Sequence, residues 1–280
     1  MLEGQATSIG ELLREVQRVT RIWSPSLSDP AEIWFRGQGR RRHRLLPALY
    51  REDVQRFHYD EGTLFERFRV LAAPYVHRQP ADDWDWYFLA RHHGLPSRLL
   101  DWSESLIIAS FFAVSEHIRG RTRLDVDRQL ERERERPTHD GDSPCVWMLD
   151  AGTLNKNTCG EDLVFVPGGS RTERYLPESL SNLPDSSNEF PIAILPPRTN
   201  ERITAQQGVF TLHGHSTLAL DQLRHPTAPE PIKLACISLD RSSVCHLWYE
   251  LQLLGMGPLS LFPELDSVAA HVSWICQSTQ

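Results

Sequence analysis

Apolar side chains recur at helical spacing in the first hundred residues. Those of residues 9–21 fall on one helical face, and Ser8 followed by Glu11 forms a capping box that sets the start of this helix. The same spacing predicts amphipathic helices over residues 61–74 and 83–93. The first third of the chain is therefore predicted to be mainly helical.

Residues 104–117 are apolar on nearly every side of the helix that they predict. A helix of this kind is usually surrounded by other elements, so we expect it at the centre of the fold. Gly94 stands where the preceding helix needs a left-handed cap, and residues 95–102 then form a compact connection. Asp101 near the end of that connection and Glu104, three residues later, make a capping box for the central helix.

Short runs rich in β-branched and aromatic residues predict the strands. Gly37 and Gly39 are expected to turn the chain out of the first strand, and helices over residues 242–254 and 263–274 close the chain. Because helices come first and strands later, without regular alternation, we predict an α+β fold in which the central apolar helix packs on a small mixed or antiparallel sheet. The predicted strands cover residues 32–36, 145–149, 190–195, 208–212 and 233–238.

A charged segment interrupts this pattern. Residues 119–142 contain seven arginines and seven acidic residues with few apolar side chains, which is typical of a solvated surface. We interpret the segment as an insert in a single domain that spans residues 1–280.

Composition narrows the classes of function. The formal net charge is −7, and the chain has neither an apolar run of membrane-spanning length nor the layout of a secretory signal, so we expect a cytoplasmic protein with no membrane partner. The five cysteines are widely spread, which predicts reduced thiols and no metal. The glycine loops of nucleotide-binding folds, the nucleophile elbow of hydrolases and the HExxH motif of metalloproteases are absent from the sequence.

The first candidate site segment covers residues 34–38, where a strand delivers Arg36 to a glycine. An arginine fixed at the end of a strand offers a planar fork of donors that fits a phosphate or a carboxylate. Gly37 lets a ligand approach the backbone, and Gln38 joins the candidate ligand-binding set. The alternative is an arginine that pairs with a structural acid.

A basic cluster follows directly. Arg40, Arg41, Arg42 and Arg44 stand together in a chain that is acidic elsewhere. Such a cluster can neutralise nucleic-acid phosphates, and binding would then weaken with salt. The alternative is a solvated loop.

The second candidate segment covers residues 92–102, between two predicted helices. It gathers His92, His93, Arg98 and Asp101 within a short stretch, which is what a preorganised polar pocket requires. The structural alternative is that Asp101 only caps the next helix and that Arg98 is its partner.

The third candidate segment covers residues 202–210. Here Arg202 precedes the pair Gln206 and Gln207, followed by Gly208, in what we expect to be strand context. Glutamine amides in a strand present a donor and an acceptor to a nucleobase or a carboxamide, and the glycine allows close approach.

The three segments together resemble the FRG domain, a family named for a Phe-Arg-Gly motif that stands here at residues 35–37. The resemblance is most specific at HHGLPSRLLDW, residues 92–102. It covers most of the chain apart from residues 119–142, and FRG domains occur largely in bacteria and phages. The resemblance also extends through Leu46, Pro47 and Arg51 and returns at residues 207–210 and 261–265.

This resemblance implies a ligand. The family is similar to ADP-ribosyltransferases in placing an arginine and a glycine at the end of an early strand, where those enzymes hold NAD. By that similarity the fold is ADP-ribosyltransferase-like, NAD is the substrate, and Arg36 holds its phosphate or ribose. His93 would complete the catalytic set together with Gln207, which would lie near the nicotinamide ribose. The implied ligand-binding residues are Gly37, Gln38, His92, Arg98, Asp101 and Arg202.

The similarity also calls for a carboxylate, because the transition state of such a transfer is cation-like at the anomeric carbon. Glu201 and Glu250 are the candidates, and no motif selects between them.

Three functions remain open from the sequence. The leading hypothesis is an enzyme, an NAD-using transferase or glycohydrolase that acts as a toxin or in phage defence. The second is a non-catalytic module that binds a nucleotide or a nucleic acid. The third is a nuclease built on His92, His93 and Asp101.

Overall fold

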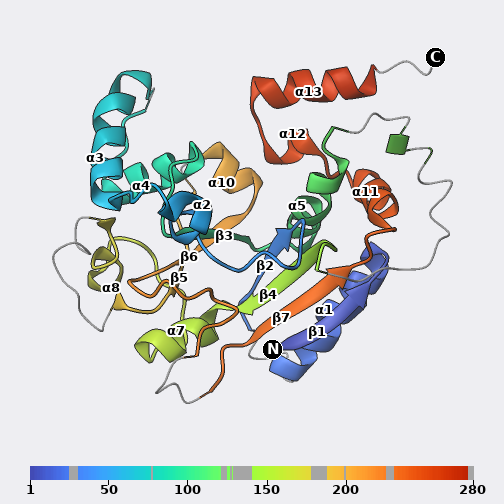
Figure 1. Cartoon of the computed structure of the whole chain (residues 1–280), viewed down its shortest axis with the longest axis horizontal. Helices are drawn as coiled ribbons and strands as arrows, with labels where there is room; N and C mark the ends of the chain where they lie inside the picture. Colours follow the sequence, from blue (N-terminus) through green and yellow to red (C-terminus); the bar gives the residue numbers. More distant parts are fainter. Residues whose placement is uncertain are drawn as a thin grey trace.

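A single seven-stranded sheet organises the fold (Figure 1), with the strand order β1-β7-β4-β2-β3-β6-β5. The computed structural model describes residues 1–24, 31–76, 78–120, 125–126, 128, 141–177, 188–198, 200–224 and 230–276. β1 and β7 run parallel, and the other neighbouring strands run antiparallel. The sheet is thus mixed, and the predicted α+β class is confirmed. The strands are β1 (Leu2–Ala6), β2 (Ile33–Gln38), β3 (Leu99–Ser103), β4 (Cys145–Asp150), β5 (Ile192–Ile194), β6 (Gly208–Leu212) and β7 (Leu234–Leu239).

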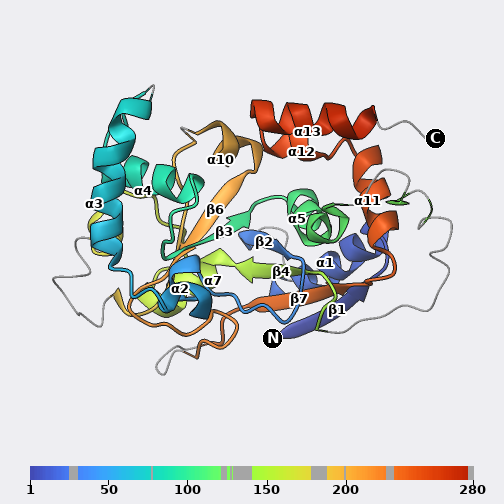
Figure 2. The same ribbon diagram turned by 45° about the horizontal axis from the view of Figure 1, so that its top comes forward.

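Helices surround the sheet (Figure 2). None of the described helices combines the length and the hydrophobicity that crossing a bilayer requires. The longer helices are α1 (Ile9–Trp23), α3 (Glu61–Ala72), α4 (Asp83–His92), α5 (Leu106–Ile118), α7 (Ala151–Cys159), α11 (Val244–Leu253) and α13 (Leu265–Ile275). The shorter ones are α2 (Glu52–Gln55), α8 (Ser170–Glu173), α10 (Glu201–Ala205) and α12 (Pro258–Leu261).

The two faces of the sheet are both covered. Successive residues of a strand point to opposite faces, so Phe35 of β2 packs with α1, α5 and α11, while its neighbour Trp34 packs with α7. All six residues of β4 are buried. A third cluster joins α3 and α4 to the β5–β6 end of the sheet. A strand covered on both faces loses the apolar-polar alternation that marks a half-exposed strand.

The apolar helix predicted at the centre is α5, which packs directly on β2. Ser105 caps it by accepting a hydrogen bond from the Ile108 amide. Gly37 lies inside β2 and not in the turn that was predicted. The residue must be a glycine, because an added Cβ would lie 1.8 Å from the Ala109 carbonyl oxygen of α5. The glycine of the Phe-Arg-Gly motif therefore permits close packing of helix on sheet.

Residues 99–103, predicted as part of a connection, form strand β3 in the middle of the sheet. The capping-box prediction was wrong, since Asp101 pairs with Phe210 of β6 and Ser105 takes the N-cap position. The stretch before β6 was also wrongly predicted. Arg202 lies in α10, and Gln207 has a positive φ of 44° in the turn that precedes the strand.

Other elements differ more modestly from the predictions. β1 and α7 were not predicted, and residues 258–275 form two helices, with Pro263 ahead of the second. Within the predicted charged insert at 119–142, residues 121–124, 127 and 129–140 lie outside the described residues. That the whole chain is one domain stays a prediction.

Candidate functional site

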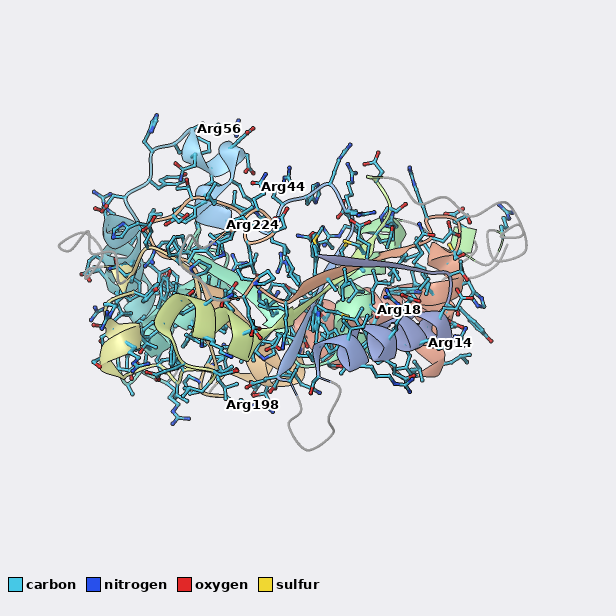
Figure 3. The ribbon with its side chains drawn as sticks, turned by 90° about the horizontal axis from the view of Figure 1, so that it is seen from below. Arg14, Arg18, Arg44, Arg56, Arg198 and Arg224 are labelled. Atoms are coloured by element: carbon cyan, nitrogen blue, oxygen red, sulfur yellow. The ribbon has the colours of Figure 1, made fainter. Side chains whose placement is uncertain are left out.

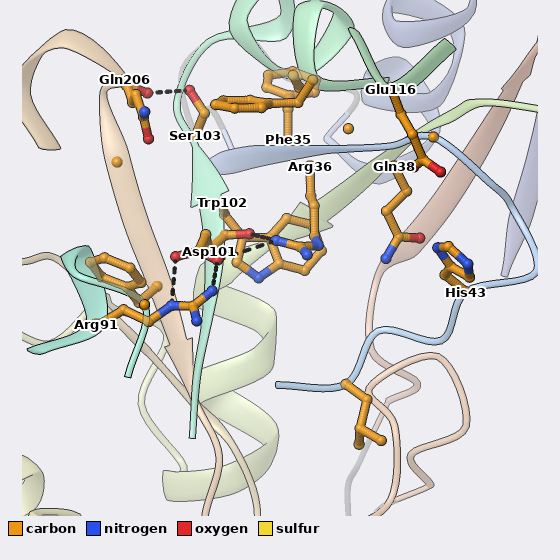
Figure 4. A pocket seen from close by; sticks show the side chains of 18 of the residues that line it. Phe35, Arg36, Gln38, His43, Arg91, Asp101, Trp102, Ser103, Glu116 and Gln206 are labelled. Atoms are coloured by element: carbon orange, nitrogen blue, oxygen red, sulfur yellow. Dashed lines mark hydrogen bonds and ion pairs between the residues drawn. The ribbon is translucent and has the colours of Figure 1, made fainter. Parts of the chain in front are cut away.

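A cavity of about 1020 Å³ opens beside the middle of the sheet. Side chains of β2, β3, α2, α4, α5 and α10 line it (Figure 4). Six of these side chains are arginines and four are carboxylates, although the chain as a whole has a net charge of −7. Aromatic rings supply much of the remaining wall. The cavity thus combines charged side chains of both signs, with arginines in the majority, and apolar surface.

Two arginines converge on one carboxylate at the floor of the cavity. Arg91 of α4 binds the Asp101 carboxylate through two nitrogens, and its Nε donates at 3.1 Å. Arg36 of β2 donates to the Asp101 backbone carbonyl, and its Nη1 lies 3.8 Å from the carboxylate (Figure 4). A bidentate guanidinium–carboxylate pair fixes both side chains in one orientation. Asp101 therefore orients these two arginines.

These contacts set the protonation states. Burial raises the pKa of Asp101, but Arg91 and then Arg36 outweigh it and hold that pKa at about 2. Burial lowers the pKa of Arg36 to about 10 against the opposite effect of Asp101. At neutral pH both guanidinium groups and the carboxylate are charged.

A third guanidinium belongs to Arg51, which follows the short 3₁₀ turn Ala48–Tyr50. Burial and then the charge of Arg91 lower the pKa of Arg51, so the two cations act on one another. Arg36 also holds its Nε buried and without a hydrogen-bond partner among the described residues. Three cations therefore lie near Asp101, and one of their donors is left without a partner; Arg51 is the exposed member of the three, and Asp53 also offsets its charge.

The opposite side of the cavity is more neutral. Gln38 accepts a hydrogen bond from the Trp147 indole at 2.8 Å through Oε1, which leaves its amide NH₂ on the cavity side. Glu116 of α5 lines the same region (Figure 4), and Arg40, outside the lining, lies 3.3 Å from its carboxylate.

Residues 261–264, which begin at the last residue of α12, contact three cavity residues, His92, Arg202 and Gln206. Glu264 lies 3.7 Å from Nε2 of His92, and the Phe262 ring stacks under the Arg202 guanidinium at 4.7 Å. Burial and then Arg202 lower the pKa of His92, so its imidazole is neutral at pH 7. Gln206 completes the contact by donating to the Leu261 carbonyl at 3.2 Å.

Comparison with known proteins bears on these same residues. Residues 31–121 match the family model of the FRG domain. The chain contains an FRG domain. The match covers about a third of the chain and includes Arg36, Arg51, Arg91 and Asp101. No curated protein and no solved structure matches the chain.

The cavity brings together some of the site residues that were predicted from the sequence. These residues are Arg36, Gly37, Gln38, His92, Asp101 and Arg202. Their convergence joins the first, second and third candidate segments at one place. The other predicted residues, His93, Arg98 and Gln207, do not line the cavity.

Arg98 lies in a buried network outside the cavity. Its side chain is 3% exposed and pairs with Glu61 at 2.5 Å, and its Nη1 donates to the His213 carbonyl at 2.6 Å. Tyr87 adds a hydrogen bond to the same glutamate at 2.6 Å. The structure thus gives Arg98 a structural partner, although that partner is Glu61 rather than the Asp101 suggested by the sequence.

His93 and Gln207 lie on exposed surface next to residues that do reach the cavity. Among the described residues, no hydrogen bond or ion pair joins either histidine to Asp101, whose carboxylate is taken by Arg91. The geometry therefore does not assemble the site that a histidine-dependent nuclease would need.

The two predicted carboxylates also lie elsewhere. Glu201 is an exposed residue of α10, and Glu250 of α11 accepts a hydrogen bond from the Ile9 amide at 2.7 Å. Neither lines the cavity.

The basic cluster after β2 is neutralised locally. Each of its four arginines forms an ion pair with a different acid, so the cluster offers little unpaired charge to a nucleic acid. The pairs are Arg40 with Glu116, Arg41 with Glu3, Arg42 with Asp142 and Arg44 with Asp221.

The site residues predicted from the sequence did not include Arg51, Arg91 or Glu116, and Gln207 was chosen in place of its neighbour Gln206. Arg91 lies in the last turn of a predicted amphipathic helix and Glu116 in the last turn of the predicted apolar helix, and charged residues at helix ends are normally solvated. Only the approach of α4 and α5 to β2 and β3 gives them a shared cavity. No group of three or more potential ligand residues in the described part of the chain is arranged to hold a metal ion.

Proposed function

We propose that the cavity binds a nucleotide through its phosphate groups, and that the nucleotide is NAD, used as an ADP-ribosyl donor or hydrolysed. The observation that carries the proposal is that Arg36 and Arg91 both contact the Asp101 carboxylate, while Arg51 lines the same cavity and its charge acts on Arg91. Charges held in a recess of low dielectric constant interact strongly, and an incoming diphosphate balances the excess.

The walls suit the rest of a nucleotide. Phe88 and Phe210 stack with ring centroids 5.4 Å apart at one side of the cavity, and Phe35 and Trp102 line it as well. Apolar and aromatic walls with a few placed polar groups are typical of small-molecule sites. The Gln38 amide is the group best placed to recognise a base or a carboxamide.

Glu116 replaces Glu201 and Glu250 as the candidate carboxylate. In the proposed reaction, the bond between the ribose and nicotinamide breaks, and its electron pair leaves with nicotinamide. Water or an acceptor hydroxyl then attacks the ribosyl cation and loses its proton. A carboxylate beside the anomeric carbon stabilises that cation, and Glu116 is a cavity-lining carboxylate on the side away from Asp101.

The test is the release of nicotinamide from NAD by the purified protein, followed by chromatography. We expect Arg36→Gln to lower kcat/KM by about 10- to 100-fold, the effect of losing hydrogen bonds to a charged ligand. Glu116→Gln should lower kcat more than it changes KM, because the carboxylate acts on the transition state.

The matched control is Arg14→Gln. Arg14 lies on α1, its side chain is 70% exposed, and Figure 3 shows it well away from Arg44 at the cavity. No release by the wild-type protein, with water or candidate protein and nucleic-acid acceptors present, would end the catalytic proposal. If ADP-ribose still binds, nucleotide binding alone survives.

A further inference from the structure

Helix α13 carries an apolar stripe that is exposed rather than buried. Leu265 is 85% exposed, Val268 43%, and Val272 and Ile275 49% each. Their spacing of three, four and three residues is that of the a and d positions of a coiled coil. An apolar seam of this spacing normally faces another helix.

The rest of the helix contributes little to its attachment. α13 has no buried residue, and its partly buried side chains are Ser267, His271 and Trp274, which lie on a different face from the stripe. Figure 2 shows the helix along an outer edge of the molecule, beside α12. The most apolar side of α13 thus points away from the core, which is the mark of an interaction surface.

We propose that α13 is the contact through which two copies of this chain associate, with the two helices antiparallel. The stripe is symmetric about residue 270. An antiparallel pair with its twofold axis there places Leu265 opposite Ile275 of the other copy and Val268 opposite Val272. A twofold contact requires a surface that complements itself, and this stripe does so.

Charge favours a second copy over an anionic partner. Residues 242–280 contain no lysine or arginine, so this surface offers no cation to a nucleic acid or an acidic lipid headgroup. Asp266 is the acidic residue of α13, and antiparallel pairing keeps the two copies of Asp266 at opposite ends of the contact.

The contact is small. An eleven-residue helix is about 16 Å long, and each copy of the chain contributes the four side chains of the stripe to the contact. Because specific interfaces usually bury more than this, we expect a reversible dimer with a dissociation constant between about 10 and 100 µM.

The test is sedimentation equilibrium of the full chain between about 2 and 200 µM, a range set by the expected dissociation constant. The wild-type protein should pass from monomer to dimer across this range. In Val268→Glu/Val272→Glu the new acids face each other across the twofold axis, and dimerisation should weaken by at least about 100-fold. Val268→Lys/Val272→Lys should behave likewise, and an equimolar mixture of the two variants should recover a dimer.

A matched control separates this contact from general surface effects. Val70→Glu/Leu71→Glu replaces two side chains of α3 that are each 71% exposed, and it should leave dimerisation unchanged. A wild-type protein that stays monomeric over the whole range overturns the proposal. So does equal weakening by the α3 variant, or a mixture of the two α13 variants that remains monomeric.

Discussion

Replacing Arg98 with methionine is expected to lower the free energy of unfolding by about 3 to 5 kcal/mol. The side chain is 3% exposed, and its guanidinium pairs with a Glu61 carboxylate whose side chain is 9% exposed. The substitution leaves that carboxylate buried without its cation and also removes a donor to the His213 carbonyl. Urea unfolding followed by circular dichroism measures the change.

The control is Arg18→Met. Arg18 is 2.8 Å from Glu15 on α1, but its side chain is 43% exposed, and exposed pairs contribute at most about 1 kcal/mol. The double variant Arg98→Met/Glu61→Leu should recover part of the loss, because the unpaired charge is then gone. If Arg98→Met and Arg18→Met cost the same, Arg98 is not the structural residue described above.

Acid is expected to destabilise the protein through His213. The imidazole is fully buried at the end of β6, and neither ring nitrogen has a hydrogen-bond partner among the described residues. Burial, and then the charge of Arg98, lower the pKa of His213 to about 3. The folded protein therefore keeps this imidazole neutral at pH values where the unfolded chain protonates it.

The direction and size of the pH effect follow by linkage. Above pH 6.5 the imidazole is neutral in both states and its full contribution to stability is present. As the pH falls from about 6.5 to about 3, only the unfolded chain gains a proton, so stability is lost. The difference between these pKa values, at roughly 1.4 kcal/mol per pH unit, amounts to about 5 kcal/mol.

Urea titrations measure the effect at about pH 7.0, above both pKa values, and at about pH 5.5 and 4.5, between them. His213→Phe should flatten the loss of stability between the first and last of these, whatever its stability at pH 7. The exposed His215, replaced in His215→Gln, is the control and should leave the pH dependence unchanged. Parallel pH profiles for the wild type and His213→Phe would contradict the assignment.

The sequence predicted the helices of the fold better than its strands. Periodicity identified the central helix α5 because burial on all sides leaves an apolar run. It missed β3, since a five-residue strand covered on both faces has no alternation and here contains Asp101. It missed β1 because that edge strand is short and polar. Local pattern carries no information about which distant strands pair.

The candidate site shows the same limit at single-residue scale. His92 is the last residue of α4 and His93 is its C-cap, so the two side chains point in different directions, and only the first reaches the cavity. Gln206 and Gln207 differ in the same way across a turn. The sequence also could not show that Arg98 is buried while Arg91 lines the cavity. The difference depends on which acid each arginine meets in the folded chain, Glu61 for Arg98 and Asp101 for Arg91.

Arg36, Arg51 and Arg91 together form the proposed phosphate-binding site, and calorimetric titration with ADP-ribose tests this most directly. We predict one site per chain, an affinity that falls as salt rises, and about 10-fold weaker binding in Arg51→Gln. Arg56→Gln, five residues away and outside the cavity lining, should bind like the wild type. Absence of binding at millimolar ADP-ribose, or equal weakening by both variants, would contradict the account.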